Sequence, residues 1–198
     1  MLTTQEFYRQ ILHAVIGVLT VILFYYNLLS PLAIFLMIIS GIVASFLSKR
    51  IRLPVFSFFL DKCERDNDKK TFPGKGMVFF FVGVLLVIQL FEKNIALAAM
   101  MILALGDSVS HLIGGSFGQI KNIFNGKSKK LFEGTIAGTI AGFLGALFFV
   151  PLPEALVGSF AAMIAEVVEI DFNHNTLDDN IVVPLVAGTV IFLMRNYL

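Results

Sequence analysis

Residues 10–48 read QILHAVIGVLTVILFYYNLLSPLAIFLMIISGIVASFLS and contain no Asp, Glu, Lys or Arg. Their only break is the turn-like Asn27-Leu28-Leu29-Ser30-Pro31. The hydrocarbon core of a bilayer is about 30 Å thick, and a helix needs roughly 17–25 apolar residues to cross it. The stretch on each side of the break reaches that length, so residues 10–48 predict two membrane-spanning helices joined by a short turn.

The rest of the chain has the same apolar character. Of its 198 residues, 57% are hydrophobic, and the mean hydropathy is +0.86, whereas soluble domains are about 45–50% apolar. The fold class is therefore all-α, a polytopic helical membrane protein, with residues 1–198 in a single integral membrane domain. The polar start includes Glu6 and predicts no cleavable signal peptide. The single Cys63 excludes an internal disulfide and has no metal-site pattern around it.

Seven apolar stretches are interpreted as spans. They are expected at roughly 9–28, 31–48, 75–91, 95–114, 133–151, 154–170 and 179–195. The polar loops on the side of the N-terminus would then cover about 49–74, 115–132 and 171–178.

The basic residues predict the orientation. Of the 15 Lys and Arg residues, 13 fall near the N-terminus, in these loops or at the loop edge at Lys75, and only Lys93 and Arg195 fall outside them. Because cytoplasmic loops carry the excess of Lys and Arg, we expect a cytoplasmic N-terminus. An even number of spans would break this bias. The expected location is the plasma membrane of a prokaryote or the endoplasmic reticulum of a eukaryote.

Two polar stretches stand at the edges of apolar spans. One is Gly106-Asp107-Ser108-Val109-Ser110-His111, and the other is Gly126-Lys127-Ser128-Lys129-Lys130, followed by Glu133-Gly134-Thr135. A carboxylate, a glycine-rich turn, a lysine cluster and a second carboxylate thus follow one another. Ionisable residues at membrane depth are costly and mark functional sites, so this order predicts a site for a metal–nucleotide complex at the cytoplasmic face.

Helical spacing places several polar residues on shared faces. Arg9 and His13 lie four residues apart on the first span, and Asp107 and His111 lie four apart on the fourth. Glu166 continues a face of small residues on the sixth span. We interpret His111 as a structural helix residue and expect the others at the cytoplasmic mouth of the bundle.

The fifth span carries a stripe of glycines, at Gly134, Gly138 and Gly142. Small residues every four positions let helix backbones approach closely in lipid, so we expect this span at the centre of the bundle. Glu133 would lie at its cytoplasmic mouth. The free backbone N–H groups of its first turn would suit a phosphate group.

With these motifs the chain resembles the CTP-dependent lipid-alcohol kinases, which are the dolichol and polyprenol kinases, the phytol kinases and the CTP-dependent diacylglycerol kinases. The resemblance runs in order over nearly the whole chain. Its motifs are Arg9-Gln10-Ile11-Leu12-His13; Gly106-Asp107-Ser108 with Gly114 and Phe117-Gly118; Gly126–Lys130 with Glu133-Gly134-Thr135; and Glu166 with Asp179-Asn180 and Pro184.

The resemblance implies a kinase that transfers the γ-phosphate of CTP to a lipid alcohol, of the polyprenol or dolichol type or a diacylglycerol, at the cytoplasmic face. Mg²⁺ is the implied cofactor. The expected partners are the lipid alcohol and the nucleotide, within the membrane and without nucleic acid, and the oligomeric state stays open.

The resemblance also implies three sets of site residues. Asp107 would be the catalytic base, with His13 and Glu133 as further catalytic residues. Mg²⁺ would be held by Asp107, Glu133 and Glu166. The nucleotide would be bound by Arg9, Gly114, Gly118, Lys127, Lys129, Lys130, Gly134, Asp179 and Asn180.

Two alternatives stay open. The lysine and Glu-Gly block is also similar to that of phosphatidate cytidylyltransferases, but this chain ends in Asp179-Asn180-Ile181-Val182-Val183-Pro184, with no arginine until Arg195. That ending favours the kinase. The second alternative is a transporter or membrane scaffold. A transporter would carry polar residues near the middle of the membrane, whereas here the polar residues gather at one interface.

Overall fold

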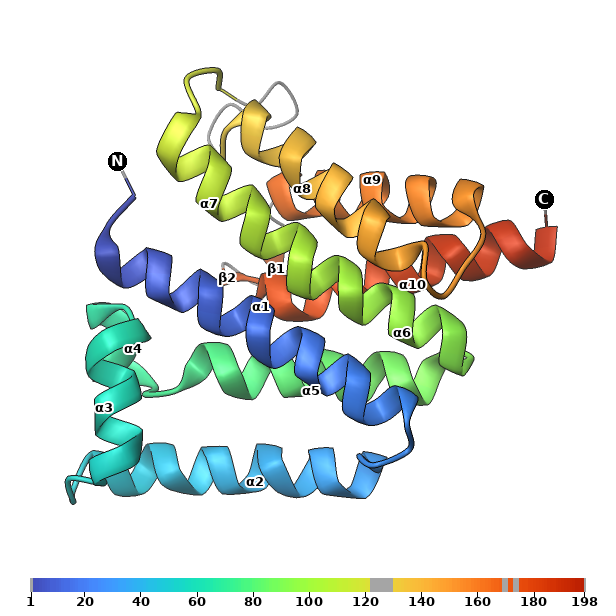
Figure 1. The fold of residues 1–198 in the computed structure, drawn as a ribbon. Helices are drawn as coiled ribbons and strands as arrows, with labels where there is room; N and C mark the ends of the chain where they lie inside the picture. Colours follow the sequence, from blue (N-terminus) through green and yellow to red (C-terminus); the bar gives the residue numbers. More distant parts are fainter. Residues whose placement is uncertain (1, 122–129, 169–170, 173–174, 198) are drawn as a thin grey trace.

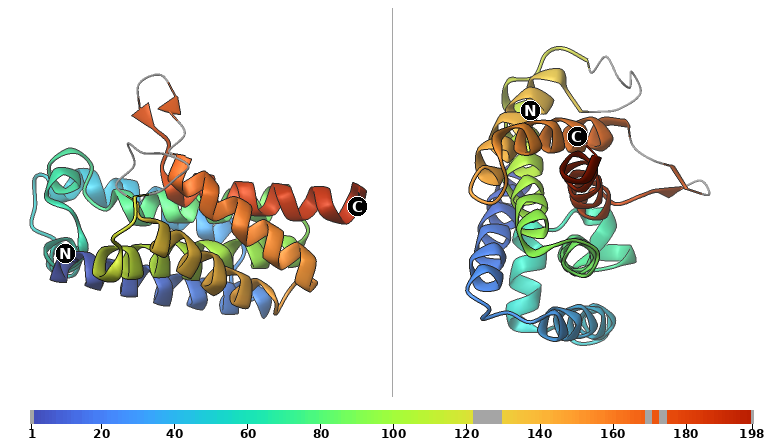
Figure 2. Two further views of the ribbon diagram at one scale, coloured as in Figure 1. Left: turned by 90° about the horizontal axis from the view of Figure 1, so that it is seen from above. Right: turned by 90° about the vertical axis from the view of Figure 1, so that its right-hand side faces the viewer.

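The computed structural model describes residues 2–121, 130–168, 171–172 and 175–197 (Figure 1). Its helices are α1 (Thr4–Tyr25), α2 (Pro31–Ser48), α3 (Pro54–Cys63), α4 (Asp66–Thr71), α5 (Lys75–Leu90), α6 (Lys93–Met101), α7 (Ser108–Phe117), α8 (Phe132–Ala146), α9 (Leu152–Val168) and α10 (Asp179–Tyr197). A π-helical segment, η1 (Ile102–Asp107), joins α6 to α7. Two short antiparallel strands, β1 (Asp171–Phe172) and β2 (Asn175–Thr176), project from the helical bundle (Figure 2).

A helix occupies most of each of the seven ranges that the sequence predicts as spans, although α8 ends at Ala146, five residues before the end of the predicted range 133–151. Within the described residues, four helices are long and apolar enough to cross a membrane, namely α1, α2, the continuous helix Lys93–Phe117 and α10. α5 is apolar but shorter, and the 15 residues of α8 reach only about 22 Å at 1.5 Å a residue. The count of seven spans and the cytoplasmic N-terminus therefore stay predictions.

The turn between α1 and α2 follows from its residues. Asn27 adopts a left-handed conformation with a φ of 58°, which asparagine tolerates better than most residues. The Ser30 hydroxyl accepts a hydrogen bond from the Ala33 backbone N–H at 3.2 Å, and Pro31 begins α2. Serine at the N-cap and proline in the first turn are the usual signals of a helix start.

The end of the bundle beside this turn holds its own polar network. The Lys93 ammonium donates to the Asn27 side-chain oxygen at 2.8 Å. Arg195 pairs with Glu154 at 2.6 Å and with Glu92 at 3.4 Å. Lys93 and Arg195, the two basic residues that the sequence sets apart from the other 13, thus lie at the same end of the structure.

The centre of the bundle is the continuous helix Lys93–Phe117, most of which is buried. The expectation that α8 occupies the centre was wrong. α8 buries its glycines but exposes Ile136, Ile140 and Leu144 on its other face. A stripe of small residues fits one close neighbour, and the large apolar side chains on the remaining face suit lipid.

The close approach that the glycine stripe predicts is confirmed. A Cβ added to Gly138 would lie 2.7 Å from the carbonyl oxygen of Gly106, and one added to Gly134 would lie 2.5 Å from that of Ser110. No side chain fits between the two backbones, so α8 packs directly on η1 and α7. This packing fixes the position of the residues that precede and follow Asp107.

We predict that Gly138→Ala destabilises the protein. The added methyl group has to displace backbone atoms of η1, and overpacking of this kind costs about 1–3 kcal/mol, which exceeds the roughly 1 kcal/mol that alanine gains over glycine in a helix. Thermal unfolding in detergent should show a lower Tm. Gly76→Ala is the matched control, because a Cβ there meets no atom within 4 Å. An unchanged or higher Tm for Gly138→Ala would contradict the packing.

Candidate functional site

Asp107 is the last residue of the π-helical segment η1. π-turns are rare and frequently lie at functional sites. The wider turn ends where Asp107, which is only 7% exposed, meets side chains from α1, α7 and α9. The sequence shows a carboxylate at the end of an apolar stretch, but no pattern in it predicts the local widening of the helix.

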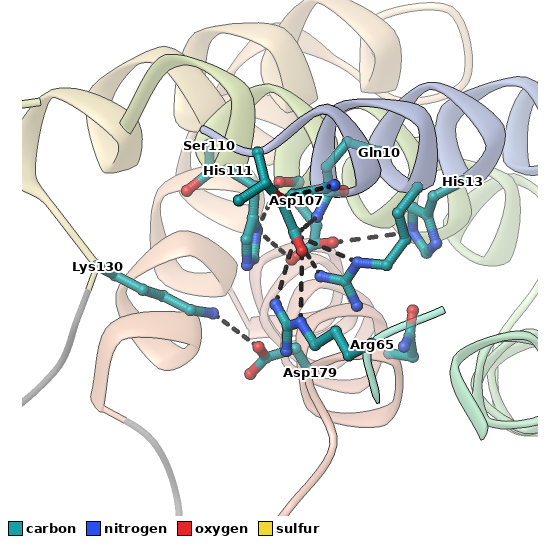
Figure 3. Close-up of polar contacts among 12 residues, drawn as sticks. Gln10, His13, Arg65, Asp107, Ser110, His111, Lys130 and Asp179 are labelled. Carbon is teal, nitrogen blue, oxygen red and sulfur yellow. Dashed lines mark hydrogen bonds and ion pairs between the residues drawn. The ribbon is translucent and has the colours of Figure 1, made fainter. Parts of the chain in front are cut away.

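Asp107, His111 and Glu166 form a compact cluster in which both carboxylates are buried. Figure 3 shows Asp107 and His111. The Nδ1 atom of His111 lies 3.3 Å from Oδ1 of Asp107 and 3.6 Å from Oε1 of Glu166. Each residue offers one ligand atom, and the three atoms lie within 4.8 Å of one another. Two carboxylates and an imidazole at this spacing could hold a divalent cation.

Lys130 provides the positive charge that these carboxylates need. Its ammonium lies 2.8 Å from Oε1 of Glu166, which is fully buried, and 2.7 Å from Oδ2 of Asp179 (Figure 3). Burial opposes the charged form of Lys130, but the adjacent Glu166 and Asp179 carboxylates raise its pKa above the ordinary value. The loop before α8 and the first turn of α10 are joined through this ion pair.

Several buried polar atoms of the cluster and of the neighbouring His13 have no hydrogen-bond partner among the described residues. They are Nε2 of His13, Oδ1 of Asp107 and Oε2 of Glu166. His13 lies 3.9 Å from Oδ2 of Asp107 and packs edge-on against the Phe80 ring at 5.1 Å. Buried polar groups are normally paired, so these atoms mark where a substrate, a water molecule or a cation can bind.

The cluster opens into a cleft of about 1600 Å³. Its lining includes charged and polar side chains from α1, α7 and α10 and apolar side chains from α1, α3 and α5. Pockets for a single small ligand usually measure about 300–1,000 Å³. The cleft is therefore large enough for two substrates.

The structure brings most of the predicted site residues to this cleft. It is lined by Arg9, His13, Asp107, Gly114, Gly118, Lys130, Asp179 and Asn180. Glu166 lies buried behind them, and Gly134 lies in the packing of α7 on α8. Lys127 and Lys129 fall outside the described residues.

Glu133 lies apart from the other predicted carboxylates. Its side chain accepts hydrogen bonds from the backbone N–H groups of Gln119 at 2.9 Å and Ile120 at 3.1 Å. It therefore anchors the chain that leaves α7, and it is not part of the cluster around Asp107.

Two residues of the site were missed by sequence reasoning. The sequence interpretation makes His111 a structural helix residue, although its spacing of four residues from Asp107 is a signal for a place at the site. Arg65 belongs to a run of mixed charge that looks solvated, yet it lines the cleft and pairs with Glu6 at 3.3 Å. Glu6 also accepts from Arg9 at 2.6 Å. No local pattern predicts that Arg65 shares this carboxylate with Arg9, because the contact between Arg65 and Glu6 spans 59 residues of chain.

The start of α10 is shaped by its proline. Pro184 lies inside α10 and has no N–H to donate to the carbonyl of Asn180. Gly83 of α5 packs directly against that carbonyl, with no room for a side chain. Asn180 in turn donates from its side chain to Asp178 at 2.8 Å. The contact of Gly83 with the Asn180 carbonyl, which Pro184 leaves without a helical donor, thus holds the first turn of α10, and Asp179 with it, at the cleft.

The chain has relatives over most of its length. It is 31% identical over 192 residues to an uncharacterized protein of Methanocaldococcus jannaschii. The aligned residues are 94% of this chain and 93% of the archaeal protein. It is 24% identical over 182 residues to CTP-dependent diacylglycerol kinase 1 of Schizosaccharomyces pombe, 78% of each chain. It is 31% identical over 134 residues to a probable chloroplastic phytol kinase 2 of Glycine max, which is 61% of this chain and 45% of that protein. No family model and no solved structure matches.

We predict that Lys130 and Glu166 are energetically coupled. Lys130→Met leaves a buried carboxylate without its cation, and breaking a buried ion pair costs about 3–5 kcal/mol. Adding Glu166→Gln removes the unpaired charge and should restore much of the loss. A double-mutant cycle of thermal unfolding measures the coupling. If the stability losses of the two single variants simply add in the double variant, the ion pair between Lys130 and Glu166 is not formed.

Glu64, at the rim of the cleft between α3 and α4, supports a pH-dependent prediction. Burial, reinforced by the nearby Asp68, raises the pKa of Glu64 from 4.5 to about 7. Between these values the folded protein binds more protons at Glu64 than the unfolded chain does. The contribution of this group to stability therefore falls as the pH rises from 4.5 to 7.

Glu64→Gln removes this loss. We expect its Tm to equal that of the wild type near pH 4.5 and to exceed it at pH 8. Asp61→Asn, which removes an exposed carboxyl group on α3, is the control and should show no such trend. A Tm difference for Glu64→Gln that stays constant with pH would contradict the raised pKa.

Proposed function

The chain belongs to the same family as the archaeal protein that it matches over nearly its whole length, and we propose that it is a membrane lipid kinase that transfers the γ-phosphate of CTP to a lipid alcohol at the cytoplasmic face. The names of the yeast and plant relatives support a lipid kinase family. The observation that carries the proposal is the cleft in which a buried cluster of carboxylates and a lysine adjoins an apolar wall.

The charges of the cluster suit phosphoryl transfer. This reaction needs in-line positioning and neutralisation of charge more than covalent help from the protein. Arg9 and Lys130 both line the cleft and would bind the phosphates. Arg65 adds a third cation at the rim. Lys127 and Lys129 remain proposed ligands of the nucleotide from the sequence.

Asp107 is our choice for the base. The proton would go to its Oδ2 atom, which lies 3.9 Å from Nε2 of His13, because the Oδ1 atom is the one that would hold a cation. Asp107 would take the proton of the lipid hydroxyl as the hydroxyl oxygen attacks the γ-phosphorus of CTP. The bond from the γ-phosphorus to the bridging oxygen breaks, and CDP leaves with the electron pair. His13 would orient the Asp107 carboxylate and the hydroxyl.

The residues present fit Mg²⁺, a hard cation that prefers oxygen ligands. Asp107 and Glu166 each keep a buried oxygen without a hydrogen-bond partner in the described part of the chain, and these two side chains would hold the ion. Lys130 contacts the other oxygen of Glu166. When bound, Mg²⁺ supplies neutralising charge to the phosphates. We leave Glu133 out of this set because two backbone N–H groups already engage its carboxylate.

The test is a CTP-dependent phosphorylation assay with the purified protein, Mg²⁺ and separate acceptors: polyprenol, phytol and diacylglycerol. The proposal predicts phosphorylation of at least one of them. Asp107→Asn should lower kcat by about 10²–10⁴-fold, the usual contribution of a general base, without lowering Tm. Asp61→Asn, an exposed carboxylate on α3, is the control. Near wild-type activity of Asp107→Asn would remove Asp107 from the reaction, and no phosphorylation of any acceptor would refute the kinase.

A further inference from the structure

One wall of the cleft is apolar. Its side chains come from three helices and are Leu12 and Ile16 on α1, Phe56, Phe59 and Leu60 on α3, and Met77 and Phe80 on α5. None of them is needed to bind a phosphate or a cation. A water-filled cleft lined by so many apolar groups is unfavourable unless a ligand covers them, so this wall requires an apolar occupant.

The apolar wall is continuous with the reacting groups. Leu12 is adjacent to His13 in the chain, and Ile16 lies about one helical turn further along α1. The Phe80 ring packs edge-on against the His13 ring, with the centroids 5.1 Å apart. His13 in turn faces Asp107 at 3.9 Å. A molecule lying on this wall therefore has one end at the unpaired polar atoms of the cluster.

Helix α3 carries features of a membrane-interface helix. It has only 10 residues, and neighbouring aromatic side chains point in different directions. Phe56 and Phe59 line the cleft, although Phe59 is also 45% exposed, while Phe58 is 59% exposed and does not line it. The Phe56 ring rests on Gly74, whose φ of +79° and lack of a side chain allow the contact. Short amphipathic helices with aromatic residues lie in the interfacial plane of a bilayer, so α3 can cover the cleft where the bilayer meets it.

We propose that the apolar wall between α1, α3 and α5 holds the hydrocarbon chain of the lipid substrate, with its hydroxyl end at His13 and Asp107. The identity of the occupant as a lipid alcohol rests on the proposed function. The cleft volume of about 1600 Å³ exceeds that of a pocket for one ligand, which leaves room for the nucleotide on the polar side and for the chain on the apolar side.

The physical role of this wall is positioning. A chain that leaves the bilayer for an apolar groove gains little hydrophobic free energy, because lipid tails are as apolar as the groove. What the groove supplies is a fixed position of the hydroxyl relative to the base, which is worth far more to the rate. Blocking the groove should therefore slow the phosphorylation of long-chain alcohols and leave that of alcohols without a chain unchanged.

The first experiment is photoaffinity labelling of the wild-type protein in detergent with geranylgeraniol that carries a diazirine near the middle of its chain. The proposal predicts labelling of peptides that contain residues 12–16, 56–60 and 77–80. Excess unlabelled geranylgeraniol should remove this labelling. Competed labelling that is absent or confined to other helices would overturn the proposal.

The second experiment compares matched variants on one helix. Leu12→Trp fills the groove, whereas Ile11→Trp adds the same bulk to a side chain that is 42% exposed and outside the cleft. Phe59→Ala opens the groove, and Phe58→Ala is its neighbouring control. The ratio of kcat/KM for geranylgeraniol to that for prenol, which has the same reacting end and almost no chain, should fall about tenfold in Leu12→Trp, equivalent to about 1.4 kcal/mol.

The controls should keep the wild-type ratio. An equal fall in Ile11→Trp, or an unchanged ratio in both Leu12→Trp and Phe59→Ala, would overturn the groove. The two proposals fail differently. Labelled peptides in the three predicted ranges without phosphorylation would keep the groove and refute the kinase, whereas phosphorylation with competed labelling elsewhere would keep the kinase and refute the groove.

Discussion

The site depends on the neutralisation of buried carboxylates. Asp107 and Glu166 lie close together and away from water, and two such charges would repel and would each lose hydration. Lys130 and His111 contact them directly. Because Lys130 also binds Asp179, the same ion pair joins the loop before α8 to α9 and α10. The chemistry and the packing at this end of the bundle therefore share one set of contacts.

Close backbone packing brings these groups together. The glycines of α8 allow it to lie against η1 and α7 without intervening side chains, and this sets Asp107 at a fixed depth in the bundle. On the opposite side Gly83 lets α5 touch the carbonyl that Pro184 leaves free on Asn180. The polar residues that do the proposed chemistry are thus held by residues that have almost no side chain.

The sequence predicts the helices better than it predicts the site. α2 begins and ends as expected, because Ser30 and Pro31 are local signals of a helix start and its apolar run is unbroken. The role of Arg65 depends on a tertiary contact with Glu6 that no local pattern encodes, whereas His111 meets Asp107 through a local spacing of four residues. The family resemblance and the order of motifs group Glu133 with the other carboxylates, whereas the backbone N–H groups that engage it are visible only in the fold.

The central claim is that the site transfers a phosphoryl group from CTP to a lipid alcohol. The most direct measurement supplies the purified protein with CTP labelled at either the γ- or the α-phosphate, lipid alcohols and, in parallel, phosphatidate, and then follows the label into the extracted lipid. The account predicts label in the lipid alcohol from the γ position only. Label from the α position would mean nucleotidyl transfer and would contradict the kinase, as would the absence of label from both.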